Sequence, residues 1–122
     1  MRISWKSATF LIIASLLAAC SIPSKITVYE MESFEKVKED TALEITNEEE
    51  IKVFSKAVRS AKKEPGAVDT LDPGYKFLYD QKSYYLWVGP GSGSIMEATD
   101  THTIYTLQKD SAKQVYKIVT DH

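Results

Sequence analysis

Three places in this 122-residue chain hold side chains whose types and spacing could do chemistry. The first is "TDTHT", where Asp100 and His102 set a carboxylate two residues from an imidazole, a pair that could serve as acid and base or help to hold a metal. A metal site normally needs three or four converging ligands, and the other histidine, His122, is expected to be frayed. We therefore expect no catalytic residue, no metal and no cofactor, with an envelope enzyme that uses Asp100 and His102 as the alternative.

The second place is the glycine-rich segment "GPGSGS", residues 89–94. Glycines allow backbone amides to approach a phosphate, but a P-loop needs Lys and Ser or Thr directly after its last glycine, and a dinucleotide fingerprint opens a helix. Here Ile95-Met96-Glu97 follows and is typical of a strand. We interpret the segment as a flexible loop between strands.

The third place is Cys20, the single cysteine, which ends an apolar run. Arg2 and Lys6 precede that run, and small residues close it, as in a secretory signal. A transmembrane anchor is the alternative, but it needs about 20 apolar residues and this run is shorter. Cleavage of this segment is therefore the prediction.

The four residues Leu17-Ala18-Ala19-Cys20 resemble the lipobox of bacterial lipoproteins. The resemblance implies that the Cys20 sulfur carries diacylglycerol and that signal peptidase II cuts between Ala19 and Cys20; acylation of the new amino terminus stays open. Two acyl chains hold a protein firmly on a bilayer. The sequence thus predicts a protein anchored by covalent lipid to the outer leaflet of a cell membrane, outside the cytoplasm, with the choice between inner and outer membrane left open.

Residues 20–122 carry 13 basic and 17 acidic side chains, a net charge of −4 with histidine neutral. This balance argues against nucleic acid as a partner. It also argues against a polybasic second anchor, because the lysines alternate with glutamates instead of clustering next to Cys20 in the sequence. The expected organisation is a cleaved signal peptide (1–19), a lipidated cysteine with a short linker (20–25) and a single small domain (26–122).

The pattern of the domain predicts the order strand, helix, four strands, helix. Residues 25–37 favour a strand or a pair of strands, and residues 45–66 a helix capped by Thr46 or Asn47, with Lys62 and Lys63 in its last turn. Four strands are expected within residues 75–108, and a closing helix after Asp110 or Ser111. This is an α+β fold, a meandering antiparallel sheet of about four to five strands with two helices on one face.

The first two of these four strands form an aromatic hairpin. Strand alternation directs Tyr75, Phe77 and Tyr79 inward. The second strand is ambiguous: if its even-numbered residues pack under the helices, Tyr85 and Trp87 lie on an open sheet face. These two residues are the candidate binding surface for an unknown protein or cell-envelope ligand. In the alternative they pack on each other or on a loop.

The segments "YYLWVG", "GSIMEA" and "IYTLQ" resemble the small YhfM-like lipoproteins of bacilli. The resemblance covers about the second half of residues 20–122 and implies the architecture, with no catalytic residue to carry over. The expected function is a non-catalytic, lipid-anchored extracytoplasmic module that binds another component of the envelope.

Overall fold

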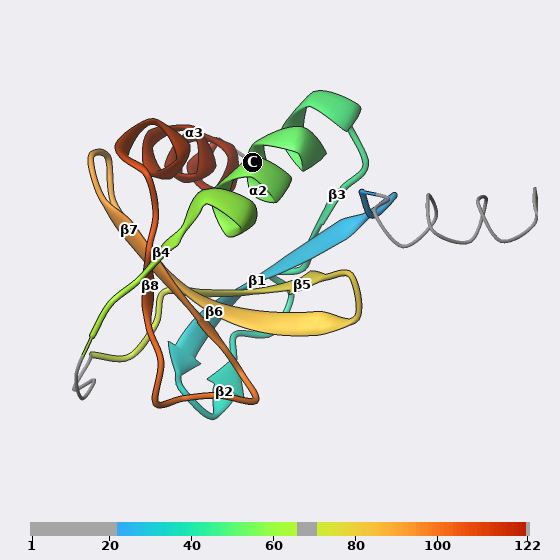
Figure 1. Ribbon diagram of the computed structural model, residues 1–122. Helices are drawn as coiled ribbons and strands as arrows, with labels where there is room; N and C mark the ends of the chain where they lie inside the picture. Colours follow the sequence, from blue (N-terminus) through green and yellow to red (C-terminus); the bar gives the residue numbers. More distant parts are fainter. Residues whose placement is uncertain (1–21, 66–70, 122) are drawn as a thin grey trace, which may run out of the picture.

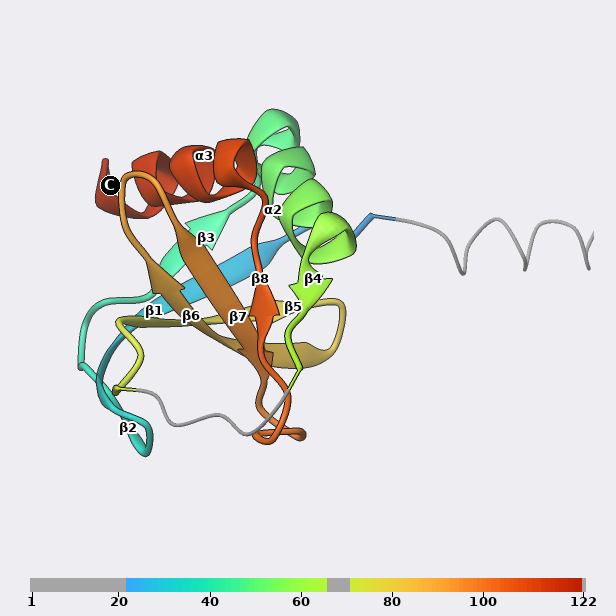
Figure 2. The ribbon, with the colours of Figure 1, turned by 60° about the vertical axis from the view of Figure 1, so that its left-hand side comes forward.

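The computed structural model describes residues 22–65 and 71–121. Two helices, α2 (Glu48–Ser60) and α3 (Lys109–Thr120), lie side by side and cover one face of an antiparallel sheet (Figure 1). The second view shows that the other face of the sheet carries no helix among the described residues (Figure 2). The fold is α+β, as the sequence predicts.

The sheet has eight strands in the spatial order β2-β1-β5-β6-β7-β8-β4, with β3 paired to β1 beside β2. Their bounds are β1 Ile26–Ser33, β2 Lys36–Val37, β3 Leu43–Ile45, β4 Lys62–Lys63, β5 Tyr75–Tyr79, β6 Lys82–Val88, β7 Gly93–Glu97 and β8 Tyr105–Thr106. The expected count of four to five strands is therefore too low. The strands that the prediction lacked have two or three residues, too few to show an alternating pattern, and they form only by pairing with a distant partner.

Strand β4 corrects the expected end of the first helix. Helix α2 stops at Ser60, and Lys62 and Lys63 pair with β8 at the edge of the sheet instead of forming a last helical turn. The expected start of this helix is confirmed: Asn47 Oδ1 accepts hydrogen bonds from the backbone N–H groups of Glu49 and Glu50, at 2.9 and 3.1 Å. The chain leaves the helix early because β8 offers Lys62 and Lys63 a ladder of backbone hydrogen bonds.

Helix α3 begins two to three residues before its expected start. Its N-cap position is Gln108, which makes no side-chain capping bond, and Asp110 and Ser111 lie inside the first turn. Ser111 is buried, whereas the Asp110 carboxylate lies where the positive end of the helix dipole favours it.

The core lies between the helices and the sheet. Phe77 and Tyr79 point inward as predicted, and the Phe77 ring stacks on Tyr84 with 5.1 Å between centroids. The Tyr79 hydroxyl lies 3.0 Å from Ser55 Oγ, which ties β5 to a buried position of α2. Helix α3 approaches the sheet closely at Gly93, where an added Cβ would lie 3.0 Å from Leu107 Cδ1 and 3.3 Å from Ala112 Cβ.

Candidate functional site

Strand β6 resolves the ambiguity that the sequence leaves in the aromatic hairpin. Tyr84 and Leu86 are buried under the helices, so Tyr85 and Trp87 point to the opposite face of the sheet. We call this face, which carries no helix among the described residues, the outer face. Both aromatic side chains are partly exposed there.

Strand pairing extends the outer face on either side of β6. Lys76 and Met96 flank Tyr85 on the neighbouring strands, and the Lys76 Nζ lies 5.8 Å from the centre of the Tyr85 ring. Ser94 lies beside Trp87, and Thr106 lies beside Ser94. The outer face thus has an aromatic part over β5 and β6 and a hydroxyl-rich part over β7 and β8.

Two loops contact the aromatic part without burying it. The ring of Phe34, from the turn between β1 and β2, meets Tyr85 and Trp87 edge-on at centroid distances of 5.3 and 5.8 Å. Trp87 Nε1 donates a hydrogen bond to the Leu71 carbonyl oxygen at 2.8 Å. The alternative in which the aromatics pack against a loop therefore holds in part, and the three rings form one partly exposed cluster.

A hollow of about 320 Å³ lies next to Trp87. Its lining consists of Trp87, Val88, Gly89, Ser92, Gly93, Ser94 and Thr106. The glycine-rich segment, expected to be only a connecting loop, thus forms part of its wall. An indole side chain beside several hydroxyl groups suits a ligand with both apolar and hydrogen-bonding surface.

Phe34, Ser94 and Thr106 were not singled out from the sequence. A signal for Phe34 existed, because an aromatic residue stands between charged residues where two short strands turn. Ser94 and Thr106 carried none, since only the register of β7 and β8 brings them beside Trp87.

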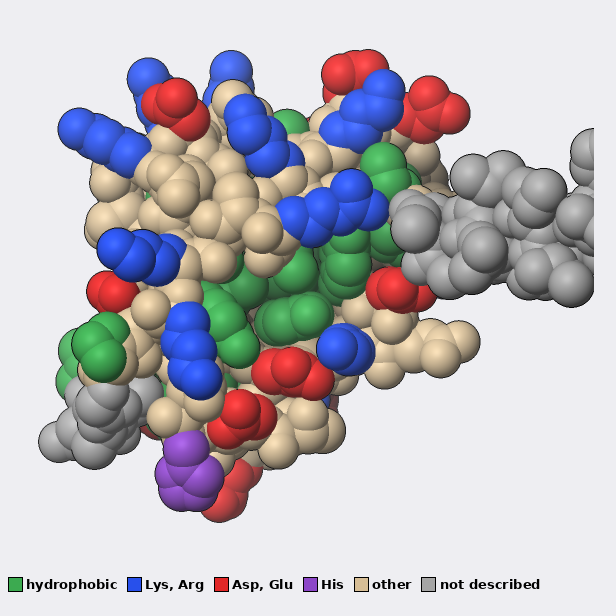
Figure 3. All heavy atoms as spheres, in the orientation of Figure 1, with side chains coloured by type: hydrophobic (Ala, Val, Ile, Leu, Met, Phe, Trp, Pro, Cys, Tyr) green, Lys and Arg blue, Asp and Glu red, His purple; other side chains and the backbone are tan. Residues whose placement is uncertain are grey.

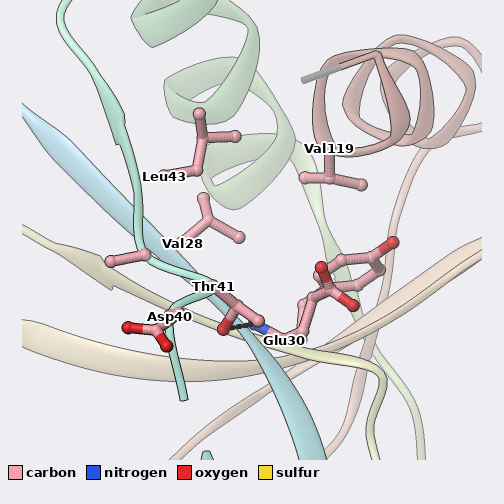
Figure 4. A pocket seen from close by; sticks show the side chains of 8 residues that line it. Val28, Glu30, Asp40, Thr41, Leu43 and Val119 are labelled. Atoms are coloured by element: carbon pink, nitrogen blue, oxygen red, sulfur yellow. Dashed lines mark hydrogen bonds between the residues drawn. The ribbon is translucent and has the colours of Figure 1, made fainter. Parts of the chain in front are cut away.

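A second cavity, of about 240 Å³, opens where the end of α3 faces β1 and the segment before β3 (Figure 4). Glu30, Asp40, Thr41 and Tyr75 give it polar groups, and the Glu30 backbone N–H donates to Thr41 Oγ1 at 3.1 Å. Glu30 Oε1 lies 3.8 Å from Lys38 Nζ. Burial, and next to it the charge of Glu30, raise the pKa of the Tyr75 hydroxyl above its ordinary value of 10.0, so this group keeps its proton to a higher pH than an exposed tyrosine.

Asp100 and His102 lie in an exposed turn between β7 and β8. The contact between them joins the His102 backbone N–H to Asp100 Oδ1 at 3.3 Å, a short-range bond typical of a turn. Within residues 22–65 and 71–121, no three His, Cys, Asp or Glu side chains converge as metal ligands. Cys20, Ala19 and the predicted signal peptide lie outside the described residues.

A family model described as YhfM protein matches residues 25–122, which is the whole expected domain (26–122) together with the last residue of the expected linker. The chain belongs to the YhfM family. The match extends the resemblance, which rested on three short segments, to the first strand and the first helix. The comparison with curated proteins found no match.

One solved structure shares the fold of this YhfM family member. It is the crystal structure of a thioesterase-like protein from Clostridium sporogenes ATCC 15579, with a TM-score of 0.59 and 22% sequence identity, covering 79% of this chain and 92% of that one. The expectation that the chain is not an enzyme is corrected here, because its architecture also occurs in a protein described as thioesterase-like. The likeness establishes the fold alone.

Neither described helix of this YhfM family member has the length and apolar character needed to cross a bilayer.

Proposed function

We propose that this YhfM family member is a lipid-anchored extracytoplasmic domain that binds a protein or a cell-envelope component through its outer face. The observation that carries the proposal is the cluster of Phe34, Tyr85 and Trp87 beside the hollow at Ser94 and Thr106. Aromatic rings that are partly exposed supply large contact area at low entropic cost, and neighbouring hydroxyls supply direction.

The proposed anchor rests on Cys20 and the segment before it. Replacing Cys20 by Ala removes the sulfur that would accept diacylglycerol, so a fatty-acid probe fed to cells should label the wild-type protein and leave the Cys20→Ala variant unlabelled. Ser21→Ala is the matched control, because it alters the next residue and keeps the thiol. A labelled Cys20→Ala protein would refute the anchor.

Ligand binding is measurable because Trp87 is the only tryptophan of residues 20–122. Titration with soluble fragments of the cell wall, both glycan and peptide, should change Trp87 emission in a saturable manner. Thr106→Val keeps the shape of the hollow and removes a hydroxyl, so it should weaken binding of a ligand in the hollow about tenfold. Lys113→Ala, on α3, should leave the affinity unchanged. Equal affinities of the Thr106→Val variant and the wild type would exclude the hollow as the ligand-binding site.

A thioester hydrolase is the second candidate function, favoured by the description of the solved structure with the same fold and by the carboxylates at the cavity near β1. In such an enzyme Glu30 would accept the proton of an attacking water. Purified protein should then hydrolyse a chromogenic acyl thioester, and Glu30→Gln should lower the rate by about a hundredfold or more. A matching pair, Asp100→Asn and His102→Ala, tests the turn as the alternative catalytic site.

A further inference from the structure

The described chain begins beside the exposed side of α2. Ile22 lines a hollow of about 310 Å³ together with Ser55, Ser60 and three basic residues of α2, Lys52, Lys56 and Arg59. All three basic side chains are exposed, and no acidic residue is among the described residues that line the hollow. Lys52 has an acidic neighbour one helical turn away, with its Nζ 3.8 Å from Glu49 Oε1.

This cluster is invisible in the sequence, where thirty or more residues separate Cys20 from these side chains. The fold brings them to the point where the chain emerges. Figure 3 shows basic side chains along the helical layer, including a group close to the start of the described chain. Helices α2 and α3 together carry six basic and four acidic side chains, although residues 20–122 as a whole have a net charge of −4.

Covalent geometry then limits the distance between this cluster and a lipid on Cys20. One residue, Ser21, separates Cys20 from Ile22, so the two residues lie at most about 7 Å apart along an extended chain. The inference rests on the proposed lipid anchor in this respect. Acyl chains on Cys20 enter the bilayer, so the membrane surface must come within about that distance of Ile22 and of the basic side chains beside it.

We propose that the surface formed by Lys52, Lys56 and Arg59 docks on anionic phospholipid head groups of the membrane that holds Cys20. A basic side chain near an anionic membrane surface strengthens binding about fivefold. Three of them beside the anchor fix the rotation of the domain on the bilayer. Because α2 covers the opposite face of the sheet from Tyr85 and Trp87, this orientation keeps the outer face accessible.

Helix α3 provides an internal control. It lies on the far side of α2 from the start of the described chain in both views (Figures 1 and 2) and carries three exposed lysines of its own, Lys109, Lys113 and Lys117. If basic charge alone determined the membrane contact, both helices would touch the membrane. If the position of the anchor next to Ile22 determines it, only α2 touches the membrane.

The first test is amine footprinting of the purified lipidated protein. It is reconstituted into phosphatidylcholine vesicles with or without 30% phosphatidylglycerol and treated with an acylating reagent. Lys52 and Lys56 should react at least about fivefold more slowly in the anionic vesicles, while Lys113 and Lys117 react at the same rate in both. High salt should abolish the difference, because it screens exposed charges. Equal rates for Lys52 and Lys56 in the two kinds of vesicle, or equal protection of α3, would overturn the proposal.

The second test compares charge-reversed variants, each carrying a dye near the end of α2 whose quenching measures how close this end lies to the lipid head groups. With the Cys20 sulfur alkylated, Ser60→Cys offers a unique thiol for a dye at the end of α2. Head-group quenchers in anionic vesicles should quench the dye in the wild-type background and in Lys109→Glu/Lys113→Glu/Lys117→Glu. Quenching should fall at least about threefold in Lys52→Glu/Lys56→Glu/Arg59→Glu.

Unchanged quenching in the α2 variant would refute head-group docking, and circular dichroism of both variants controls for folding. Flotation with the vesicles distinguishes the lipid anchor from the docking of α2 on the head groups. A protein that does not float lacks the lipid anchor, whereas a protein that floats with Lys52 and Lys56 fully reactive has the anchor without the docking.

Discussion

Trp87 makes two contacts on the outer face: an edge-on contact with the Phe34 ring and a hydrogen bond from its Nε1 to the Leu71 carbonyl oxygen. Trp87→Ala should lower the free energy of unfolding by about 1–2 kcal/mol, less than the roughly 3–5 kcal/mol of a fully buried tryptophan. Trp87→Phe keeps a ring that can contact Phe34 and loses the hydrogen bond together with part of the ring area, so it should cost about 1 kcal/mol, less than Trp87→Ala. Urea titrations of the two variants check both values. A loss above about 3 kcal/mol for Trp87→Ala would mean that this side chain belongs to the core.

Tyr84 makes the stability of the domain sensitive to alkaline pH. Burial, and next to it the charge of Glu97, raise the pKa of its hydroxyl above the ordinary value of 10.0. The unfolded chain therefore ionises at lower pH than the folded one, and stability that is complete below about pH 10 is lost as the pH rises further. Tyr84→Phe keeps the stacking on Phe77 and should unfold less steeply above about pH 10 than the wild type, as measured by urea midpoints across that range. Identical pH profiles of stability for Tyr84→Phe and the wild type would show that the Tyr84 hydroxyl does not cause the alkaline loss of stability.

At the scale of elements, the packing of α3 on β7 depends on Gly93. An added methyl would press on Leu107 and Ala112 and would lie 3.3 Å from the Trp87 carbonyl oxygen. Gly93→Ala should therefore lower the melting temperature, by a free-energy change of about 1–2 kcal/mol. Gly91→Ala, two residues earlier, is the matched control, because no atom lies within 4 Å of the position of its added Cβ. Equal melting temperatures of the two variants would show that the sheet and α3 adjust without cost.

The elements also show how far the sequence could predict this molecule. The Asn47 cap, the amphipathic stripe of α2 and the inward row of β5 follow from local chemistry, and the structure agrees with them. The short strands β3 and β4 were not predicted, because they depend on partners elsewhere in the chain and no local pattern marks them. The hollow beside Trp87 was missed for the same reason, since the register of β7 and β8 and not any motif brings Ser94 and Thr106 there.

At the scale of the whole molecule, the core described between helices and sheet needs no disulfide. Residues 26–122 alone should therefore fold reversibly under reducing conditions, and their far-ultraviolet circular dichroism should show mixed helix and sheet. Dispersed amide resonances in nuclear magnetic resonance spectra provide a second measurement. A disordered spectrum would mean that the first 25 residues or a membrane completes the fold.

Helix α2 links β3, which is paired to β1 near one side of the sheet, to β4, which closes the opposite edge against β8. Strand β4 therefore emerges during synthesis some forty residues before the partner that gives it its hydrogen bonds. Contacts this distant along the chain slow folding, because loop-closure entropy is lost before the contact forms. The domain should therefore stay incompletely folded until nearly its last residue is made. Until then proteases can cleave the chain, and it can pass through a narrow channel.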